Sequence, residues 1–154
     1  MDKALIDQYE AGGEKLRAAI RGLSVQDLQA FPVPGTWSIQ QIVIHVMDSD
    51  LISADRMKRI IAEENPTLIG YDETKFSKNL FYNDQPAEDA ATILDLNRKL
   101  FARVLRKMPD SAFARTGMHN ERGQITLGGY LKAVVDHLDH HLKFIHTKRA
   151  KLGK

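Results

Sequence analysis

The sequence contains no cysteine and only one tryptophan among its 154 residues. Without cysteine there can be no disulfide, no thiolate zinc site and no cysteine nucleophile. No apolar run approaches the ~20 residues of a membrane span, and the opening stretch MDKALIDQYEAGGEKL lacks the apolar segment of a secretory signal. The net charge is +2, with acidic and basic residues interleaved, so no basic surface for nucleic acid is indicated. These absences predict a cytoplasmic protein with neither a membrane nor a nucleic-acid partner.

Apolar residues recur at helical spacing in four long segments, which begin and end at recognisable signals. Ser38 is followed three residues later by Gln41, which is the pattern of a capping box. Thr126 is placed to cap the last segment, and Pro66 and Pro109 stop the second and third segments. The predicted long helices are residues 2–21, 38–64, 86–109 and 126–152.

These helices predict an all-α fold, a four-helix bundle that takes up the whole chain, residues 1–154, as a single domain. The two connections at 65–85 and 109–125 are long for a bundle, and long ordered loops often form the walls or lids of functional sites. The first connection is expected to hold one short helix near 72–78. The second is expected to be rich in turns and almost free of strands.

The stretch VVDHLDHHLKFIH, residues 134–146, holds four of the six histidines of the chain. At ~100° per helical residue, His137 and His141 lie at the edge of the apolar stripe of this helix, whereas His140 faces solvent and His146 lies on the opposite border. Side chains four residues apart stack on one face of a helix, so this pair can converge on one divalent ion. In the alternative interpretation, His137 is a boundary residue and His141 is a core histidine bonded to a buried carbonyl.

A metal site in a bundle core draws its ligands from facing helices, and His45 is the remaining histidine within a predicted long helix. His45 shares a helical stripe with Ser49 and Arg56, beside the main apolar face. A polar stripe in this position favours a water-filled pocket between helices. A buried histidine satisfied by ordinary hydrogen bonds remains the alternative.

Two stretches together resemble the DinB/YfiT-like family of helical-bundle, metal-dependent enzymes. TWSIQQIVIHVMDSD contains Trp37-Ser38 with His45 seven residues after the serine, and HNERGQITLGGYLKAVVDHLDHHLKFI leads from a loop histidine into the last helix. The resemblance implies that His45, His137 and His141 bind one divalent ion, zinc, nickel or a similar metal. His119 matches a recurring loop histidine with a structural or pocket role.

Three imidazoles leave coordination positions open for water or substrate, as in catalytic metal sites. The metal could activate water for hydrolysis of a small molecule. The resemblance also implies transfer of a small thiol of the bacillithiol or mycothiol type, which must be a cosubstrate because the chain has no cysteine. The rival interpretation is a noncatalytic stress-related bundle whose metal is structural or adventitious, with Phe144 or Tyr130 filling the site.

No residue stands out as a general base in the sequence. Asp48 and Asp136 are candidates to orient a neighbouring imidazole through a hydrogen bond. Arg56 lies ~16 Å along the helix axis from His45, from a rise of ~1.5 Å per residue, and is a candidate to bind an anionic end of a substrate or to form a surface ion pair. The resemblance also makes a homodimer formed through a helix face a candidate assembly.

Overall fold

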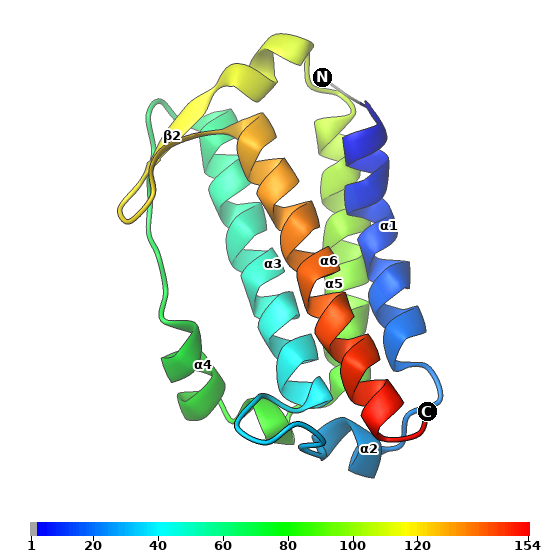
Figure 1. Cartoon of the computed structure of the whole chain (residues 1–154). Coiled ribbons are helices and arrows are strands. Elements are labelled where there is room, and N and C mark those ends of the chain that lie inside the picture. Colours follow the sequence, from blue (N-terminus) through cyan, green and yellow to red (C-terminus); the bar gives the residue numbers. More distant parts are fainter. Residues whose placement is uncertain (1–2) are drawn as a thin grey trace.

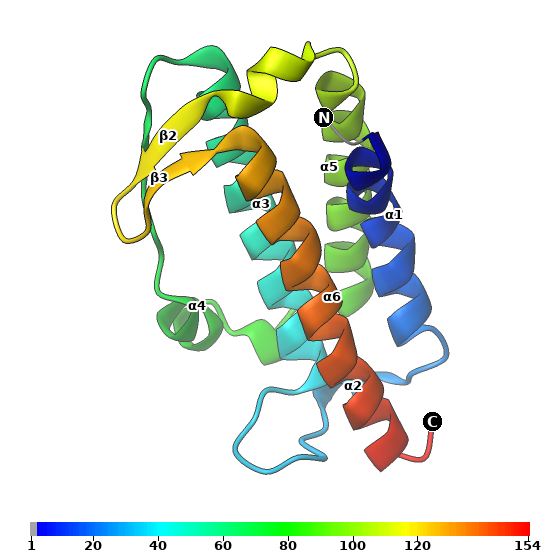
Figure 2. The ribbon, with the colours of Figure 1, turned by 45° about the horizontal axis from the view of Figure 1, so that its top comes forward.

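The computed structural model describes residues 3–154, and its long helices form a bundle (Figures 1 and 2). The all-α four-helix fold predicted from the periodicity is confirmed. The long helices are α1 (Lys3–Ile20), α3 (Ile39–Ala62), α5 (Ala87–Leu105) and α6 (Leu127–Lys151). Helix α1 packs mainly on α5 and α6, and α3 also packs mainly on α5 and α6, so α1 and α3 are diagonal in the bundle although they are consecutive long helices.

The helix starts follow the capping signals of the sequence. Ser38 and Gln41 form a complete capping box, in which the serine oxygen accepts from the Gln41 N–H and the glutamine oxygen accepts from the Ser38 N–H. Ser24 makes the same arrangement with Asp27 at the short helix α2 (Val25–Gln29). Thr126 caps α6 by accepting from the Gly129 N–H. Each cap satisfies N–H groups that the first turn of a helix leaves unpaired.

The two long connections contain more regular structure than the sequence indicated. The first holds β1 (Thr67–Leu68), the short helix α4 (Glu73–Asn79) and the 3₁₀ turn η1 (Tyr82–Asp84), and the second holds the 3₁₀ turn η2 (Asp110–Ala114), β2 (Thr116–His119) and β3 (Gly123–Thr126). The expectation of a turn-rich, almost strand-free second connection is therefore wrong. The predicted extension of the third long helix to Pro109 is wrong as well, because α5 ends at Leu105.

The strands form a small sheet of order β1-β2-β3, with β1 parallel to β2 and β2 antiparallel to β3. The hairpin closes with His119 opposite Gly123, whose φ of 74° is the left-handed conformation of a three-residue hairpin loop. In both views the hairpin and α4 lie beside α3, and an extended segment joins the end of α3 to α4 (Figures 1 and 2). These two appendages cover the side of the bundle on which the cavity described below lies.

The apolar core is divided into two clusters by a polar layer. One cluster includes Leu16, Met47, Leu94 and Leu138, and the other includes Tyr9, Met57, Phe101 and Val135. Between these levels the buried residues include Gly12 and Gly13 in α1, Asp50 in α3, and Asp95 and Arg98 in α5. Asp50 and Arg98 form the centre of the layer as a buried ion pair, with 2.8 Å between the Arg98 Nε and the Asp50 Oδ1.

Arg98 is almost fully enclosed, with a side-chain exposure of 2%. Its remaining guanidinium nitrogens donate to the backbone oxygens of Tyr9 and Val134, at 3.2 and 3.5 Å. Asn97 donates to the second oxygen of Asp50 at 2.8 Å. The guanidinium of Arg98, which belongs to α5, therefore forms hydrogen bonds to residues of the other three long helices, α1, α3 and α6.

The glycine pair in α1 is explained by the close approach of α5. A Cβ placed on Gly12 would lie 2.1 Å from the Arg98 Nη1, and a Cβ on Gly13 would lie 2.6 Å from the Asp95 Cα. Glycine lowers helix stability by ~1 kcal/mol relative to alanine. Glycine is needed at these two positions despite its lower helix propensity, because a side chain there would push α1 away from Asp95 and Arg98.

We therefore expect Gly13→Ala to destabilise the protein, although alanine is the better helix former. The added methyl group meets the Asp95 Cα and Cβ, which are fixed by helix α5. Overpacking of about 1–3 kcal/mol therefore outweighs the gain in helix propensity. Gly128→Ala in α6 is the matched control, since its Cβ would meet only ordinary contacts at 3.4 Å or more. Urea denaturation measures both changes, and equal effects of the two substitutions would contradict the steric explanation.

None of the helices within residues 3–154 combines the length and the apolar character that a bilayer crossing requires.

Candidate metal centre

Three histidines from two facing helices meet at one point of the bundle. His45 lies in α3, and His137 and His141 lie one turn apart in α6. The ligand nitrogens of the three side chains lie within 4.8 Å of one another, and His45 is buried while the other two are half-buried. The structure thus brings together the three histidines that the helical geometry of the sequence selected.

The distances within this group match those around a metal ion. The His137 Nε2 lies 3.2 Å from the His45 Nε2 and 3.1 Å from the His141 Nε2. Two imidazole nitrogens at ~2.1 Å from a tetrahedral zinc ion are ~3.4 Å apart. Neutral His137 offers one donor or one acceptor at Nε2, so it cannot hydrogen-bond both neighbours at once. A cation bound by the Nε2 lone pairs of His45, His137 and His141 would give each of the three nitrogens a partner, which hydrogen bonds among them cannot do.

The protonation of the histidines also favours cation binding. Burial, together with the neighbouring imidazoles, lowers the pKa of His45, His137 and His141 to about 4 each. The three rings are therefore neutral at pH 7. Metal binding at that pH needs no proton to be displaced from them.

Packing, rather than hydrogen bonding, fixes two of the rings. The Nδ1 atoms of His45 and His141 are buried and have no hydrogen-bond partner among the described residues. The His45 ring instead packs against Trp37, with 4.9 Å between ring centroids, and the His141 ring packs against His137 at 4.5 Å. The expected carbonyl partner of His141 is absent from the described contacts, which disfavours the interpretation of this residue as an ordinary core histidine.

Glu73, the first residue of α4, is the acidic group at this centre. Its Oε2 lies 3.7 Å from the His45 Nε2, and its side chain is 61% exposed. Glu73 lies 28 positions beyond His45 in a connection without helical periodicity, so the sequence gives no sign that it approaches the histidines. The only local signal was Asp72, which accepts from the Lys75 N–H and so starts a helix at this point.

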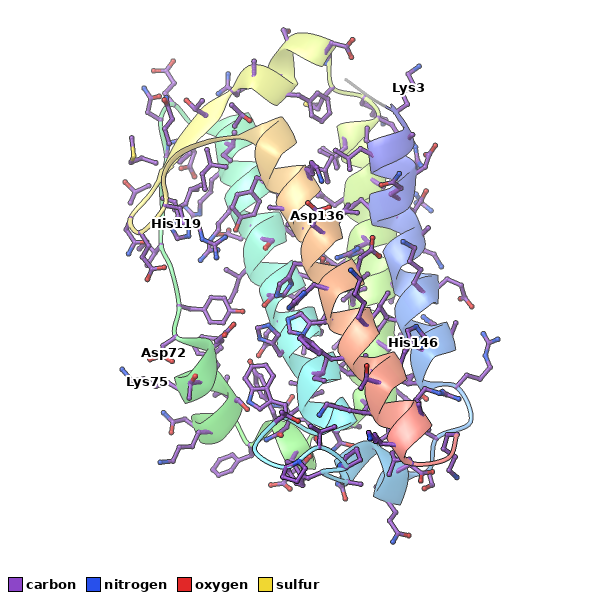
Figure 3. The ribbon with its side chains drawn as sticks, in the orientation of Figure 1. Lys3, Asp72, Lys75, His119, Asp136 and His146 are labelled. Carbon is purple, nitrogen blue, oxygen red and sulfur yellow. The ribbon has the colours of Figure 1, made fainter. Side chains whose placement is uncertain are left out.

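The other candidate residues lie elsewhere. Asp48 accepts a hydrogen bond of 2.6 Å from the Tyr82 hydroxyl, and Asp136 pairs with Lys132 at 2.6 Å on the surface. Neither carboxylate has a described hydrogen bond to an imidazole. His140 is exposed on α6, as the periodicity predicted, and His146, which was placed on the opposite border of the helix, is exposed as well. His146 projects from the side of α6 opposite to His119 and α4 (Figure 3).

A cavity of about 300 Å³ extends from the metal centre along α3 towards the hairpin. His137 and Glu73 line the cavity at the end next to the metal centre. Arg56, His119 and Tyr130 line it at the end next to the hairpin. Figure 3 shows His119 on the hairpin and Asp72 at the start of α4 on the same side of the bundle. Glu73, Glu121 and Arg122 line the cavity and are exposed, so it opens to solvent.

Tyr130 and Phe144 do not fill the centre. Tyr130 lies at the far end of the cavity, where its hydroxyl accepts from the Arg56 Nη1 at 2.7 Å. Phe144 is 45% exposed, and its ring centroid is 6.0 Å from that of His141. Space next to His137 is thus available to a small molecule.

Ion sites in four-helix bundles take their ligands from facing helices, and the three converging imidazoles have this arrangement. Residues 8–145 match the DinB superfamily. The chain belongs to this family, as the motifs indicated.

Similar proteins carry names that agree with this site. A protein of Oceanobacillus iheyensis named "putative metal-dependent hydrolase" is 29% identical over 140 residues, which are 91% of this chain and 81% of that protein. A protein of the same description from Bacillus mycoides is 29% identical over 148 residues, 96% of this chain and 85% of that protein.

Two solved structures share the fold. YfiT from Bacillus subtilis, described as a probable metal-dependent hydrolase with an unusual four-helix bundle topology, superposes with a TM-score of 0.91 at 26% identity, over 97% of this chain and 86% of that chain. A mycothiol-dependent maleylpyruvate isomerase superposes with a TM-score of 0.69 at 10% identity, over 90% of this chain and 58% of that chain. The second likeness concerns the fold alone.

Proposed function

We propose that the protein is a metal-dependent hydrolase of small molecules, with His45, His137 and His141 as ligands of one divalent ion. The observation that carries this proposal is the convergence of three Nε2 atoms at a centre that borders a solvent-accessible cavity. Structural zinc sites are closed by four protein ligands, whereas catalytic sites keep an open position. Imidazole ligands are compatible with zinc, nickel, copper and iron, so the ligand type does not select one of these metals.

Glu73 is the proposed general base. Its carboxylate is within 3.7 Å of a ligand nitrogen and reaches solvent, so it can accept a proton from a water molecule at the centre. A divalent ion held by the three imidazoles would supply Lewis acidity at this centre. Glu73 would then hold the abstracted proton and return it to the leaving group.

The exchange Glu73→Gln tests this role, because glutamine keeps the shape of the side chain and cannot accept a proton. We expect hydrolysis of p-nitrophenyl acetate by the zinc-loaded protein to fall by about 100-fold, the lower end of general-base contributions, with zinc content unchanged. Glu88→Gln is the matched control, since Glu88 lies in the first turn of α5 and does not line the cavity. Loss of zinc in Glu73→Gln would instead make Glu73 a ligand, and unchanged hydrolysis would rule out the base.

Thiol transfer is the second candidate, favoured by the solvent-open cavity of about 300 Å³ beside His137, in which a small thiol could bind next to the metal centre. The chain has no cysteine, so the thiol must be a cosubstrate, and the fold likeness to a mycothiol-dependent enzyme is consistent with this. In this reaction a thiolate sulfur attacks an electrophilic carbon and displaces its leaving group. Adding cysteine together with chlorodinitrobenzene distinguishes the two functions, because only a transferase accelerates the release of chloride.

A homodimer through α5 is the assembly that we propose. The outer face of α5 carries four apolar side chains that are 41–60% exposed: Ile93, Leu96, Leu100 and Val104. The same helix has Glu88 and Asp89 in its first turn and Arg103 in its last turn. An antiparallel α5 of a second copy would place acidic residues against basic ones while covering the apolar stripe, as a two-fold interface requires.

We expect Leu96→Glu combined with Leu100→Glu to convert this dimer to a monomer, because the new carboxylates would be buried in the interface. Sedimentation velocity measures the change in mass. Val25→Glu is the control, since Val25 is 66% exposed on α2 and outside the stripe. A wild-type protein that sediments as a monomer would dismiss the proposed interface.

A further inference from the structure

Arg56 is a buried cation without a carboxylate partner. Its side chain is among the buried residues, with an exposure of 8%, and the ion pairs found within residues 3–154 do not include it. The guanidinium donates to the Tyr130 hydroxyl at 2.7 Å and to the backbone oxygen of Ile69, whereas its Nε has no partner among the described residues. Both partners are neutral, so they satisfy hydrogen bonds and leave the charge uncompensated.

Other donors lie around Arg56 in the same end of the cavity. The His119 Nδ1 accepts from the Glu121 N–H at 3.2 Å, which leaves the proton of the neutral ring on Nε2 as a donor. Burial lowers the pKa of His119, and Arg56 and Arg122 lower it further, which keeps the ring neutral. Ser53 lies one turn before Arg56 and also lines the cavity.

The charges along the cavity are unevenly distributed. Asp50 is already paired with Arg98, and Glu73 lies at the metal end, next to His45. At the hairpin end, Arg56 and Arg122 face the single carboxylate of Glu121, which is exposed on the hairpin loop. This end therefore has an excess of positive charge. Of these three charged side chains, Arg56 is buried and the other two are exposed.

We propose that the hairpin end of the cavity binds the carboxylate or phosphate group of an elongated small-molecule substrate, with Arg56 as the buried anchor. Arg122, exposed on the hairpin, would close over the bound group. A guanidinium matches the planar geometry of both anions. The inference rests on the proposed function, because it names the substrate class of the same cavity: an anionic group at one end and the bond to be cleaved at the metal centre.

The position of the anchor explains its use in catalysis. The Cα atoms of Arg56 and His45 are separated by eleven residues of one helix, roughly 16 Å along its axis. Binding energy from a group so far from the reacting bond orients the substrate without involving the metal. Anion binding can therefore be measured on protein that holds no metal.

The test is isothermal titration of metal-free full-length protein with succinate and, separately, with inorganic phosphate at low salt. We expect saturable binding of at least one of the two, with the tighter of them identifying the group that the site prefers. Arg56→Gln should weaken this binding by roughly 10- to 100-fold, the effect of losing a hydrogen bond to a charged group. Arg122→Gln, on an exposed loop, should weaken it by about 2- to 5-fold.

Arg59→Gln is the matched control, because Arg59 lies one turn further along α3 and is paired with Asp55 and Glu63 on the surface. Equal weakening in Arg59→Gln, equal binding of neutral succinamide, or no saturable binding of either dianion would overturn the proposal. If Arg56→Gln does not fold, unchanged binding in Arg122→Gln would overturn it as well. Metal content is measured separately, so an empty metal centre and an absent anion site give different results.

Discussion

Replacing His137 and His141 together by alanine is expected to leave the purified, untagged protein without its divalent ion. The wild-type protein should carry close to one ion per chain by elemental mass spectrometry. The free energy of zinc binding to a four-ligand structural site is ~10–16 kcal/mol, so each ligand raises the affinity for the ion by roughly 100- to 1,000-fold. Losing two of three protein ligands therefore empties the centre during dialysis. His45→Ala should have the same effect from the opposite helix, because the three Nε2 atoms form one group.

The last helix provides the control for this experiment. His140 and His146 lie on α6 as exposed residues, and the combined change His140→Ala and His146→Ala removes the same number of imidazoles. This variant should keep its metal. If it loses as much metal as the His137 and His141 variant, the ion is adventitious. If the wild-type protein carries no ion, the three histidines do not form a metal site. In either case the proposed hydrolase loses its cofactor.

The helices and the three histidines could be predicted because both depend on local rules. Capping at Ser38 and Thr126 fixes where α3 and α6 begin, and a period of 3.6 residues then determines which histidines face the bundle. His137 and His141 are one turn apart, so their common direction needs no knowledge of the rest of the fold. That His45 faces them followed from the family resemblance and from its position on a polar stripe.

The sheet and Glu73 could not be predicted because they depend on contacts between distant segments. Thr67 pairs with Met118 and Leu68 with His119 across about fifty residues, and strands of two to four residues are too short to alternate visibly. Glu73 reaches the metal centre only because α4 is held beside α3 by this connection. The residues next to Glu73 in the sequence do not indicate that it lies near the three histidines.

The role of Arg56 also depends on contacts between distant segments. Its place on the His45 stripe was evident, and both an anion anchor and a surface ion pair were consistent with the sequence. The structure removes the second alternative, since Arg56 is buried and its described partners are a tyrosine hydroxyl and a carbonyl. Whether a charge is compensated depends on which side chains the fold brings near it, and spacing along one helix does not contain that information.

Asp50→Ala is expected to cause the largest loss of stability among single changes in the polar layer. The substitution leaves Arg98 enclosed without a counter-charge, and breaking a buried pair in this way costs about 3–5 kcal/mol. For a chain of this size that loss lowers the melting temperature by roughly 6–20 °C. Asp55→Ala in the same helix is the control, because its pair with Arg59 is exposed and contributes less than ~1 kcal/mol.

The double change Asp50→Leu with Arg98→Met separates the pair from the enclosed charge. Both ionic groups are removed, so no charge is left unpaired, and the double variant should be more stable than Asp50→Ala alone. Calorimetry on all three variants gives the comparison. A double variant as unstable as the single one would mean that the contacts of Arg98 with the Tyr9 and Val134 carbonyls, rather than the charge balance, hold the four helices together. A double variant at least as stable as the wild-type protein would show that the polar layer costs stability that an apolar layer recovers. Its retention would then be explained by the cavity that Asp50 and Arg98 line beside the metal centre.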